Sequence, residues 1–428
     1  MRFSTLSTLA IATTVVMASP TTVHKRSPIS LPFAKVINAT GVLNIVAHDL
    51  ARYKALRSPA KSATSQDSVI SAPADDIGMS YIASVGVGTP PTFCKPAIGR
   101  SSTVPDNNVN LTTDSLIIDT GSSNTWIGAD PLHAYISTSS SVPLVEPIVV
   151  DYGSGEFVGL AFSDTITIGS LVILEQTIGV ALLAFGFTDV DGILGIGPVN
   201  RTMETLVLDP EAEIPTVVDN AFTQALIPED VVAVSFEPAT SNPDMNGELT
   251  FGGTDPSKYT GSITYTPVTS ISPSSSFWGI EQTITYGSEI ILNQTAGIVD
   301  TGTTLLGLAS DAYSAYQSAT GASLDSSTDL LTITSEQYAN LQNLTFTIGD
   351  TEFVMTPNAQ IWPRSLNTVI GGTPGVVYLV VINLGTPSGE GLDFINGQVF
   401  LERFYSVYDT TNKRVGLANT PFTFATSN

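Results

Sequence analysis

Two aspartates lie in short stretches of the same kind. Asp119 stands in SLIIDTGSSNTWIG, and Asp300 stands in AGIVDTGTTLLG. Each aspartate follows an apolar run and precedes Thr-Gly and further hydroxyl side chains. A single Asp-Thr-Gly is a common turn, because Asp favours turn starts and Gly tolerates positive φ. Two matching copies, 181 residues apart, predict two similar lobes that each contribute one carboxylate to a cleft between them.

A pair of carboxylates can hydrolyse an amide without a metal or a histidine. Two carboxylates about 3 Å apart share one proton, so one acts as an acid and the other as a base on a trapped water. The base activates the water against the carbonyl carbon, and the acid protonates the carbonyl oxygen. Gly121 and Gly302 are expected to let the backbone turn tightly beside the carboxylates. The hydroxyls of Ser122 and Thr303 can donate to the outer carboxylate oxygens.

Other catalytic groups are scarce in this chain. It has one cysteine, Cys94, and beyond residue 70 it has one histidine, His133. A Ser-His-Asp triad would depend on that histidine, and a zinc site of His and Cys lacks ligands. One cysteine cannot form an intrachain disulfide, and no Gly-Lys-Ser/Thr phosphate loop occurs. We therefore expect carboxylate chemistry with no metal and no cofactor.

Charge divides the chain into a basic start and an acidic remainder. The first 70 residues hold eight Lys or Arg and two Asp or Glu, whereas the other 358 residues hold eight and 37. The acidic remainder argues against nucleic acid as a partner. We expect the basic segment to dock on the acidic body and to leave when carboxylates are protonated, as an inhibitory propeptide would. A disordered basic linker is the alternative.

The first 18 residues have the features of a secretory signal peptide. An apolar Thr/Ala/Val run follows Arg2, and Val16-Met17-Ala18 offers a small-residue cleavage site. The run is too short for a membrane span, and we expect no membrane anchor. Five Asn-x-Ser/Thr sequons support a secreted glycoprotein: Asn38, Asn110, Asn200, Asn293 and Asn343. The expected location is extracellular, with the vacuole as the alternative.

The elements that would position the aspartates are predicted to be mainly β-strands. Short apolar and β-branched segments are broken by Gly, Pro and Asn, as in PIVVDYGSGEFVGLAF and GSITYTPV. Two short helices are expected, one over 216–227 and one over 310–319 with Ser310 as its N-cap. We divide the chain into a signal peptide (1–18), a basic propeptide (19–75), an N-terminal lobe (76–253) and a C-terminal lobe (254–428).

These motifs together resemble those of the pepsin-like aspartic peptidases, most closely the fungal secreted members of the polyporopepsin kind. The resemblance covers nearly the whole chain after about residue 75. It rests on DTGSSNTW, DYGSGEFVG, DGILGIGP, GELTFGGTDPSKYTGSITYTPV, IVDTGTT and FLERFYSVYDTTNKRVGLA. It implies a bilobal acid-protease fold with a central cleft, and an aspartic endopeptidase that is made as a zymogen and works at acidic pH.

By position, the resemblance makes the two aspartates the catalytic pair and assigns a flap to DYGSG. Tyr152 would be the flap tyrosine, with its ring over the substrate and its hydroxyl reaching Trp126. Gly153 and Ser154 would offer backbone groups to an extended peptide. The implied partners are peptide or protein substrates, the chain's own propeptide and pepstatin-type inhibitors. The enzyme would be a monomer that prefers apolar side chains on both sides of the scissile bond.

Two segments depart from the family pattern. In many relatives a second apolar-apolar-Gly segment lies in the C-terminal lobe, but here it reads FINGQVF, so we expect Asn396 to find hydrogen bonds in a buried site. Between GTPPT and DSLIID, the extra residues Phe93 to Thr113 intervene. We interpret them as translated intron from an incorrect gene model. A genuine surface insertion at a hairpin turn is the alternative.

Two other functions are open at this point. A catalytically silent pepsin-like protein could serve as a binding or inhibitor protein. Such relatives usually have a damaged aspartate pair or flap, whereas this chain keeps both Asp-Thr-Gly turns and Tyr152. A glycosidase also uses two carboxylates and no metal, yet its acids need not lie in matching turns. We therefore predict a secreted acid endopeptidase.

Overall fold

Strands dominate the part of the chain that the structure describes. This computed structural model describes residues 26–37, 43–58, 79–89, 114–130, 134–187, 189–238 and 244–428. The predicted signal peptide and the segment 93–113, like Cys94 and His133, lie outside the described residues. Within these ranges no helix is long and apolar enough to cross a membrane. The predicted mainly β class is confirmed.

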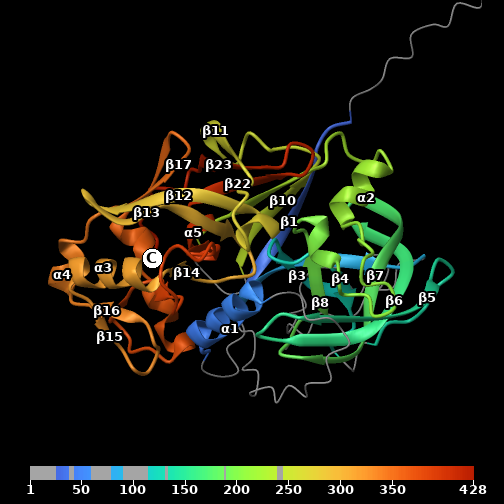
Figure 1. The fold of residues 1–428 in the computed structure, drawn as a ribbon, viewed down its shortest axis with the longest axis horizontal. Coiled ribbons are helices and arrows are strands. Elements are labelled where there is room, and N and C mark those ends of the chain that lie inside the picture. Colours follow the sequence, from blue (N-terminus) through green and yellow to red (C-terminus); the bar gives the residue numbers. More distant parts are fainter. Residues whose placement is uncertain are drawn as a thin grey trace, which may run out of the picture.

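One large sheet runs through the molecule and joins its two halves (Figure 1). In the described ranges its order is β11-β23-β22-β9-β10-β1-β2-β3-β8-β4-β7-β6-β5. The strands are β1 (Ile29–Ile37), β2 (Met79–Val87), β3 (Asp114–Asp119), β4 (Thr125–Ile127), β5 (Val142–Asp151), β6 (Glu156–Ile168), β7 (Leu171–Phe185), β8 (Gly192–Gly195), β9 (Val231–Phe236), β10 (Asp244–Phe251), β11 (Thr260–Pro267), β22 (Phe404–Asp409) and β23 (Arg414–Asn419).

The C-terminal half has two further sheets, on the left in Figure 1. The larger has the order β18-β17-β12-β13-β21-β14-β20, and the smaller has the order β15-β16-β19. Their strands are β12 (Gly279–Tyr286), β13 (Glu289–Val299), β14 (Leu306–Leu308), β15 (Ser323–Leu324), β16 (Leu331–Ile333), β17 (Leu344–Ile348), β18 (Thr351–Met355), β19 (Val377–Tyr378), β20 (Val381–Asn383) and β21 (Phe394–Asn396).

The same three-strand arrangement occurs once in each half. In the N-terminal half, β3 runs parallel to β8, which pairs antiparallel with β4. In the C-terminal half, β13 runs parallel to β21, which pairs antiparallel with β14. The two Asp-Thr-Gly sequences lie at the ends of the equivalent strands β3 and β13. The sequence repeat is therefore also a structural repeat.

The helices of the described residues are short. They are α1 (Ile45–Arg57), α2 (Val217–Thr223), α3 (Ser310–Thr320), α4 (Ser335–Ala339) and α5 (Gln398–Leu401). They range from the exposed α4 to the fully buried α5. Helix α2 is shorter than predicted, because Thr216 caps its start and Ala225 has a positive φ of 53° beyond its end. Ser310 is the first residue of α3 and not its N-cap, which is Ala309. The Ser310 hydroxyl donates to Asn383 Oδ1 (2.8 Å) instead of capping the helix.

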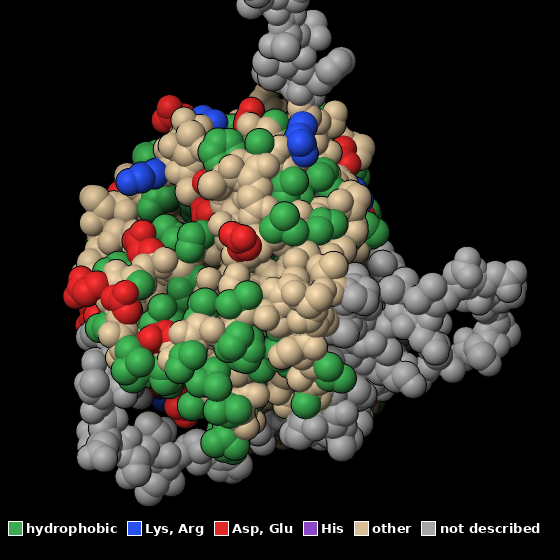
Figure 2. Space-filling model, turned by 90° about the vertical axis from the view of Figure 1, so that its right-hand side faces the viewer, with side chains coloured by type: hydrophobic (Ala, Val, Ile, Leu, Met, Phe, Trp, Pro, Cys, Tyr) green, Lys and Arg blue, Asp and Glu red, His purple; other side chains and the backbone are tan. Residues whose placement is uncertain are grey.

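The three successive antiparallel strands β5, β6 and β7 form a surface with one inward and one outward face. On the inward face, the Phe157 ring stacks on Trp126 with 4.5 Å between ring centroids. Apolar side chains also gather on the outward end of the molecule (Figure 2). The large apolar residues exposed on these strands include Leu144, Val145, Val172, Leu182, Leu183 and Phe185. Buried and partly buried positions largely alternate along β6, as expected for a strand with one face in the core.

Two elements from the basic start of the chain are part of the folded body. Strand β1 lies between β10 and β2 and pairs antiparallel with both. Its Phe33 ring packs edge-on against Tyr81 and Phe236, with 5.6 Å between centroids in each case. Helix α1 lies between the two halves of the molecule (Figure 1). The basic segment therefore contributes a central strand and a helix at the junction.

A carboxyl group lies buried at the start of β9. Asp230 is within reach of Asp219 in α2 and of Asp409 in β22. Burial is the largest cause that raises the pKa of Asp230, to about 7, and the charge of Asp219 and a hydrogen bond with it add to this effect. Asp230 is therefore protonated in the folded protein in acid.

We expect Asp230 to lower the free energy of unfolding as pH rises. Because its pKa is raised from 3.8 to about 7 on folding, its contribution is complete below 3.8 and is lost as pH rises through about 7. Asp230→Asn should shrink the stability difference between about pH 4 and pH 7 by about 1–2 kcal/mol, a value reduced for solvent screening. Urea unfolding at both pH values measures this, with exposed Asp350→Asn as the control. An unchanged difference in Asp230→Asn would contradict the assignment.

Candidate active site

Asp119 and Asp300 come together where the two halves of the molecule meet. Asp119 is the last residue of β3, and Asp300 directly follows β13. Both side chains are fully buried. The strand next to each aspartate holds its backbone: Asp119 pairs with Gly195 of β8, and the Asp300 N–H donates to the Asn396 carbonyl of β21 (3.1 Å). The repeated strand arrangement thus delivers one carboxylate from each half.

Each carboxylate accepts the same two hydrogen bonds from its own turn. One comes from a glycine N–H to Oδ1, and the other from a hydroxyl to Oδ2. The four bonds are Gly121 N to Asp119 Oδ1 (2.9 Å), Ser122 Oγ to Asp119 Oδ2 (2.5 Å), Gly302 N to Asp300 Oδ1 (3.0 Å) and Thr303 Oγ1 to Asp300 Oδ2 (2.5 Å). The two carboxylates are therefore held in equivalent orientations.

Gly121 and Gly302 fill their positions because there is no space for a side chain. Neither residue has a positive φ. A β-carbon on Gly121 would lie 2.6 Å from Asp300 Oδ1, and one on Gly302 would lie 2.5 Å from Asp119 Oδ1. Besides lying in the expected turns, each glycine thus allows the opposite carboxylate to approach the backbone.

Thr120 and Thr301, which are missing from the site predicted above, tie the two turns together. The backbone N–H of each donates to the hydroxyl of the other, at 2.9 Å and 3.0 Å. The Thr301 hydroxyl donates to the Ile118 carbonyl (2.8 Å), and the Thr120 hydroxyl donates to the Val299 carbonyl (3.2 Å). All four bonds are buried. The sequence did contain a signal, since threonine occupies the same place in both Asp-Thr-Gly copies.

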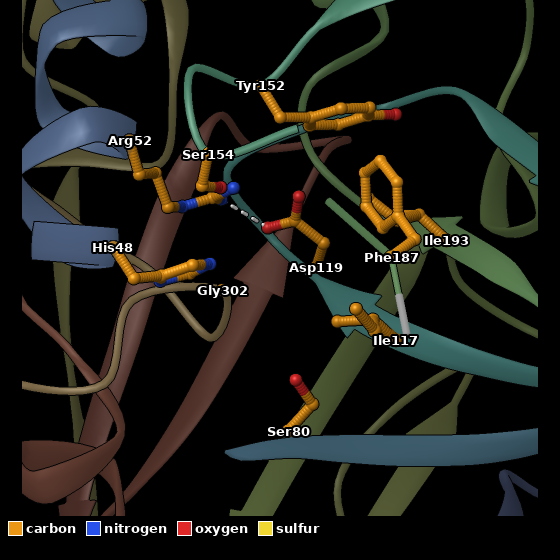
Figure 3. A pocket seen from close by; sticks show the side chains of 10 residues that line it. All are labelled: His48, Arg52, Ser80, Ile117, Asp119, Tyr152, Ser154, Phe187, Ile193 and Gly302. Atoms are coloured by element: carbon orange, nitrogen blue, oxygen red, sulfur yellow. Dashed lines mark hydrogen bonds and ion pairs between the residues drawn. The ribbon is translucent and has the colours of Figure 1, made fainter. Parts of the chain in front are cut away.

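Tyr152 lies at the tip of the β5–β6 hairpin, and its ring covers Asp119 in Figure 3. Its hydroxyl accepts a hydrogen bond from Trp126 Nε1 (2.9 Å). Burial is the main cause that raises the pKa of Tyr152 above its ordinary value, so the hydroxyl stays neutral. Gly153 follows with a φ of +74°, a conformation that favours glycine. The structure thus brings together the tyrosine and tryptophan that were expected to meet.

Two recesses adjoin the carboxylates beneath Tyr152. The first has an apolar wall, formed by Ile117, Phe187 and Ile193, and Ser154 also lines it (Figure 3). The second is lined by Gly121, Ser122, Asn124, Val150, Asp151 and Arg201. Helix α1 closes both recesses, with His48 and Arg52 at the first and Arg52, Ala55 and Leu56 at the second.

Helix α1 places the Arg52 guanidinium against both carboxylates. Its Nη2 donates to Asp119 Oδ1 (2.6 Å) and Asp300 Oδ1 (3.0 Å), and its Nε donates to Asp300 Oδ2 (2.8 Å). Figure 3 shows this side chain reaching from the helix to Asp119. Arg52 is only 5% exposed, so these contacts are shielded from solvent. A cation from the basic start of the chain thus neutralises the buried acidic pair.

The two carboxylates have different pKa shifts despite their equivalent turns. Burial raises the pKa of Asp119, and the negative charge of Asp300 adds to this, so the net shift is upward although Arg52 opposes it. Burial also acts to raise the pKa of Asp300. For Asp300, however, the positive charge of Arg52 and the hydrogen bonds from Arg52, Thr303 and Gly302 outweigh burial, so the pKa is lowered. One carboxyl thus favours the protonated form more than the other does.

Asn396, at the end of β21, lies directly behind this site. It is fully buried, and its Nδ2 donates to Gln282 Oε1 (2.9 Å) while Gln282 Nε2 donates to Asn396 Oδ1 (3.2 Å). The expectation that this buried amide is paired is confirmed.

In the described ranges no group of three or more His, Cys, Asp or Glu is placed to hold a metal ion.

Known proteins are similar to this chain in sequence and in fold. Residues 109–420 match a family model described as eukaryotic aspartyl protease. Polyporopepsin from Irpex lacteus is 58% identical over 359 residues, which cover 84% of this chain and 99% of that protein. Vacuolar protease A from Aspergillus fumigatus is 29% identical over 79% of this chain and 78% of its own length. The crystal structure of aspartic proteinase from Irpex lacteus superposes with a TM-score of 0.77 at 51% identity, over 94% of this chain and 100% of that one.

Thr301→Val should destabilise the protein where the two halves meet. The change removes the hydroxyl that pairs with the Thr120 N–H and the Ile118 carbonyl, and each buried group left unpaired costs about 1–3 kcal/mol. We expect the free energy of unfolding in urea to fall by about 2–4 kcal/mol. Thr301→Ser keeps the hydroxyl and should stay within about 1 kcal/mol of wild type. Equal losses in the two variants would show that the hydroxyl does not join the two turns.

Proposed function

We propose that Asp119 and Asp300 are the catalytic pair of this chain, which belongs to the eukaryotic aspartyl protease family. As a member of that family it is an aspartic endopeptidase with a pepsin-like bilobal fold. The observation that carries the proposal is the equivalent pairing of both carboxylates, each with a glycine N–H on Oδ1 and a hydroxyl on Oδ2. Each Oδ1 lies against the opposite glycine, so these oxygens are the inner ones. They are placed to share one proton and one water.

The reaction follows from that arrangement. One carboxylate takes a proton from the water while the water oxygen forms a bond to the peptide carbonyl carbon. The other carboxyl gives its proton to the carbonyl oxygen, so a neutral tetrahedral intermediate forms. The first carboxyl then gives the proton that it took from the water to the nitrogen, and the C–N bond breaks. The second carboxylate takes a proton from a hydroxyl of the intermediate, which becomes the product carboxylic acid, so the pair again shares one proton. Ser122 and Thr303 keep the outer oxygens occupied throughout.

The substrate in this proposal is an extended peptide that lies between the carboxylates and the Tyr152 hairpin. The recess with Ile117, Phe187 and Ile193 suits an apolar side chain next to the scissile bond. Gly153 and Ser154, at the tip of the hairpin, offer backbone groups to the peptide. The same space suits pepstatin-type inhibitors, which are themselves peptides.

We further propose that the docked basic segment is an inhibitory propeptide. Arg52 blocks the carboxylates, and α1 is fixed next to them because Asp49 accepts hydrogen bonds from the backbone of Thr304 (3.1 Å) and Leu305 (2.8 Å). Lys35 of β1 forms a buried ion pair with Glu402. A substrate cannot reach the carboxylates while α1 remains in place.

Acid should release this segment. The Arg52 contact stabilises the docked state while Asp300 is ionised, and the contact is lost as pH falls through the lowered pKa of Asp300. Release also uncovers the edges of β10 and β2, which β1 separates. The unpaired N–H and C=O groups of those edges need new partners, so release involves a rearrangement of the central sheet.

Secretion is the remaining part of the proposal. The sequon residues Asn200, Asn293 and Asn343 are all exposed, as glycan attachment requires. The predicted signal peptide and the sequons at residues 38 and 110 lie outside the described residues. A secreted monomer with an acidic surface is the form that we propose to be active in acid.

Cleavage of denatured haemoglobin between about pH 3 and pH 7 tests the catalytic pair. We expect acid-activated wild-type enzyme to cleave it and Asp300→Asn to lose at least about 10³-fold in rate, because the pair can no longer supply both acid and base. Pepstatin should abolish the wild-type activity. Exposed Asp350→Asn is the matched control and should cleave normally. Substantial cleavage by Asp300→Asn would reject the two-carboxylate mechanism.

Arg52→Gln tests the inhibitory segment. Without the guanidinium, the contact that holds α1 against the two carboxylates is lost, so conversion to active enzyme at about pH 5 should be at least about tenfold faster than in wild type. Gel electrophoresis and the appearance of activity after a shift from pH 7 measure the rate. Lys54→Gln removes an exposed charge from the same helix and should convert at the wild-type rate. If Arg52→Gln and Lys54→Gln convert equally fast, Arg52 does not hold the segment in place.

A further inference from the structure

Arg201 lines the second recess beside the carboxylates. We propose that Arg201 selects substrates with an acidic side chain close to the scissile bond. This inference rests on the proposed peptidase function and names a feature of its substrates. It differs from the expectation that both sides of the scissile bond take apolar side chains, which remains the alternative.

The backbone holds Arg201 firmly next to the carboxylate turn. The residue lies in the 3-10 helix η2 (Val199–Thr202), just after Gly197, whose N–H donates to the Ser122 carbonyl (2.8 Å). The Thr202 hydroxyl accepts from the Ile214 N–H (2.7 Å) and closes the end of η2. Since Ser122 also donates to Asp119, Arg201 is separated from the catalytic pair by one short, well-bonded segment.

The guanidinium of Arg201 is only partly satisfied within the protein. Its carbon lies 4.4 Å from the centroid of the Phe277 ring, which covers one face of the group. Its Nε is buried and has no hydrogen-bond partner, and no ion pair joins Arg201 to a carboxylate among the described residues. A buried charged donor without an acceptor is unfavourable, so a ligand that supplies one is favoured.

The charges around Arg201 change when the segment with α1 leaves. In the present state Arg52 repels Arg201, and Ala55 and Leu56 help to close the recess. Of the residues that line the two recesses, His48, Arg52 and Arg201 are the basic ones, and the first two belong to α1. Once α1 has left, Arg201 is the basic residue that remains among those that line the two recesses.

Two acidic side chains of the same half of the molecule lie near Arg201. Asp151 lines the same recess and accepts a hydrogen bond from the Gly153 N–H (2.8 Å), while Glu204 acts on Arg201 through its charge. Neither forms an ion pair with Arg201, so the fork of N–H donors remains available to a substrate carboxylate. An arginine fork binds a carboxylate through two parallel hydrogen bonds, which gives selectivity for Glu or Asp over their amides.

The preference should depend on pH through the substrate and not through Arg201, which stays charged in acid. A glutamate side chain has an ordinary pKa of about 4.3, so it is mostly neutral at about pH 3 and mostly ionised at about pH 5.5. The selection of Glu over Gln is therefore expected to increase between these two pH values.

Matched peptides test the proposal. Each pair differs by Glu or Gln at one of the three positions on either side of a fixed scissile bond, and mass spectrometry confirms the bond that is cleaved. For acid-activated wild-type enzyme we expect kcat/KM to favour Glu about tenfold at one position at about pH 5.5, and clearly less at about pH 3. Arg201→Gln should bring that ratio close to one, and Arg201→Lys should retain part of it. Arg364→Gln, which removes an exposed arginine far along the chain, should keep the wild-type ratio.

The outcomes separate this inference from the function on which it rests. If wild-type enzyme cleaves haemoglobin and the Gln peptides but shows a Glu/Gln ratio near one at every position, the inference is wrong and the peptidase function stands. A preference for Glu that persists in Arg201→Gln also overturns it. If Arg201→Gln cleaves no peptide, Arg201→Lys decides: a ratio between one and the wild-type value supports the inference, and a ratio at or above the wild-type value overturns it. Failure of wild-type enzyme to cleave any substrate would overturn both proposals.

Discussion

The reciprocal hydrogen bonds between Thr120 and Thr301 are the constraint on which the rest of the site depends. They join two turns that are 181 residues apart in sequence, and they do so in a buried setting where unpaired backbone groups are costly. Once the turns are joined, β3 and β13 must end at the same place, and each carboxylate faces the glycine of the other turn. The repeated strand arrangement meets this constraint, because each half of the molecule brings one of these strands to the junction.

The same constraint creates an electrostatic problem that the basic segment solves. Two carboxylates held together in a buried site cannot both ionise easily, and at neutral pH a buried charge needs a partner. Arg52 supplies that partner with three hydrogen bonds, so the protein is compensated at neutral pH by a part of itself that also obstructs the site. Protonation of the carboxylates removes the need for the partner. In the function that we propose, inhibition and release in acid both depend on this one contact.

Sequence patterns predicted the features that depend on local chemistry, but not those that depend on distant contacts. The mainly β class, the bilobal fold and the family are confirmed, and the aspartates meet because their repeated motifs end equivalent strands. Periodicity could not show that β1 inserts between β10 and β2, because that pairing joins residues more than 200 positions apart. It also could not distinguish a glycine required for space from one required for a turn. The catalytic roles and the lobe boundary at residue 253 remain predictions.

In our two proposals, arginines beside the carboxylates link the control of this enzyme to its choice of substrate. Beyond residue 70 the chain has eight Lys or Arg against 37 Asp or Glu. A basic side chain that is partly buried next to the site, as Arg201 is, is therefore unusual in this acidic part of the chain. Arg52 and Arg201 repel each other in the docked state, and this repulsion acts against the segment that carries Arg52. Arg52 binds the two aspartates, we propose that Arg201 binds a carboxylate of the substrate, and carboxylates lose their charge in acid. The segment should therefore leave most readily at low pH, whereas recognition of an acidic substrate by Arg201 strengthens in the upper part of the acidic range, after the segment has been released.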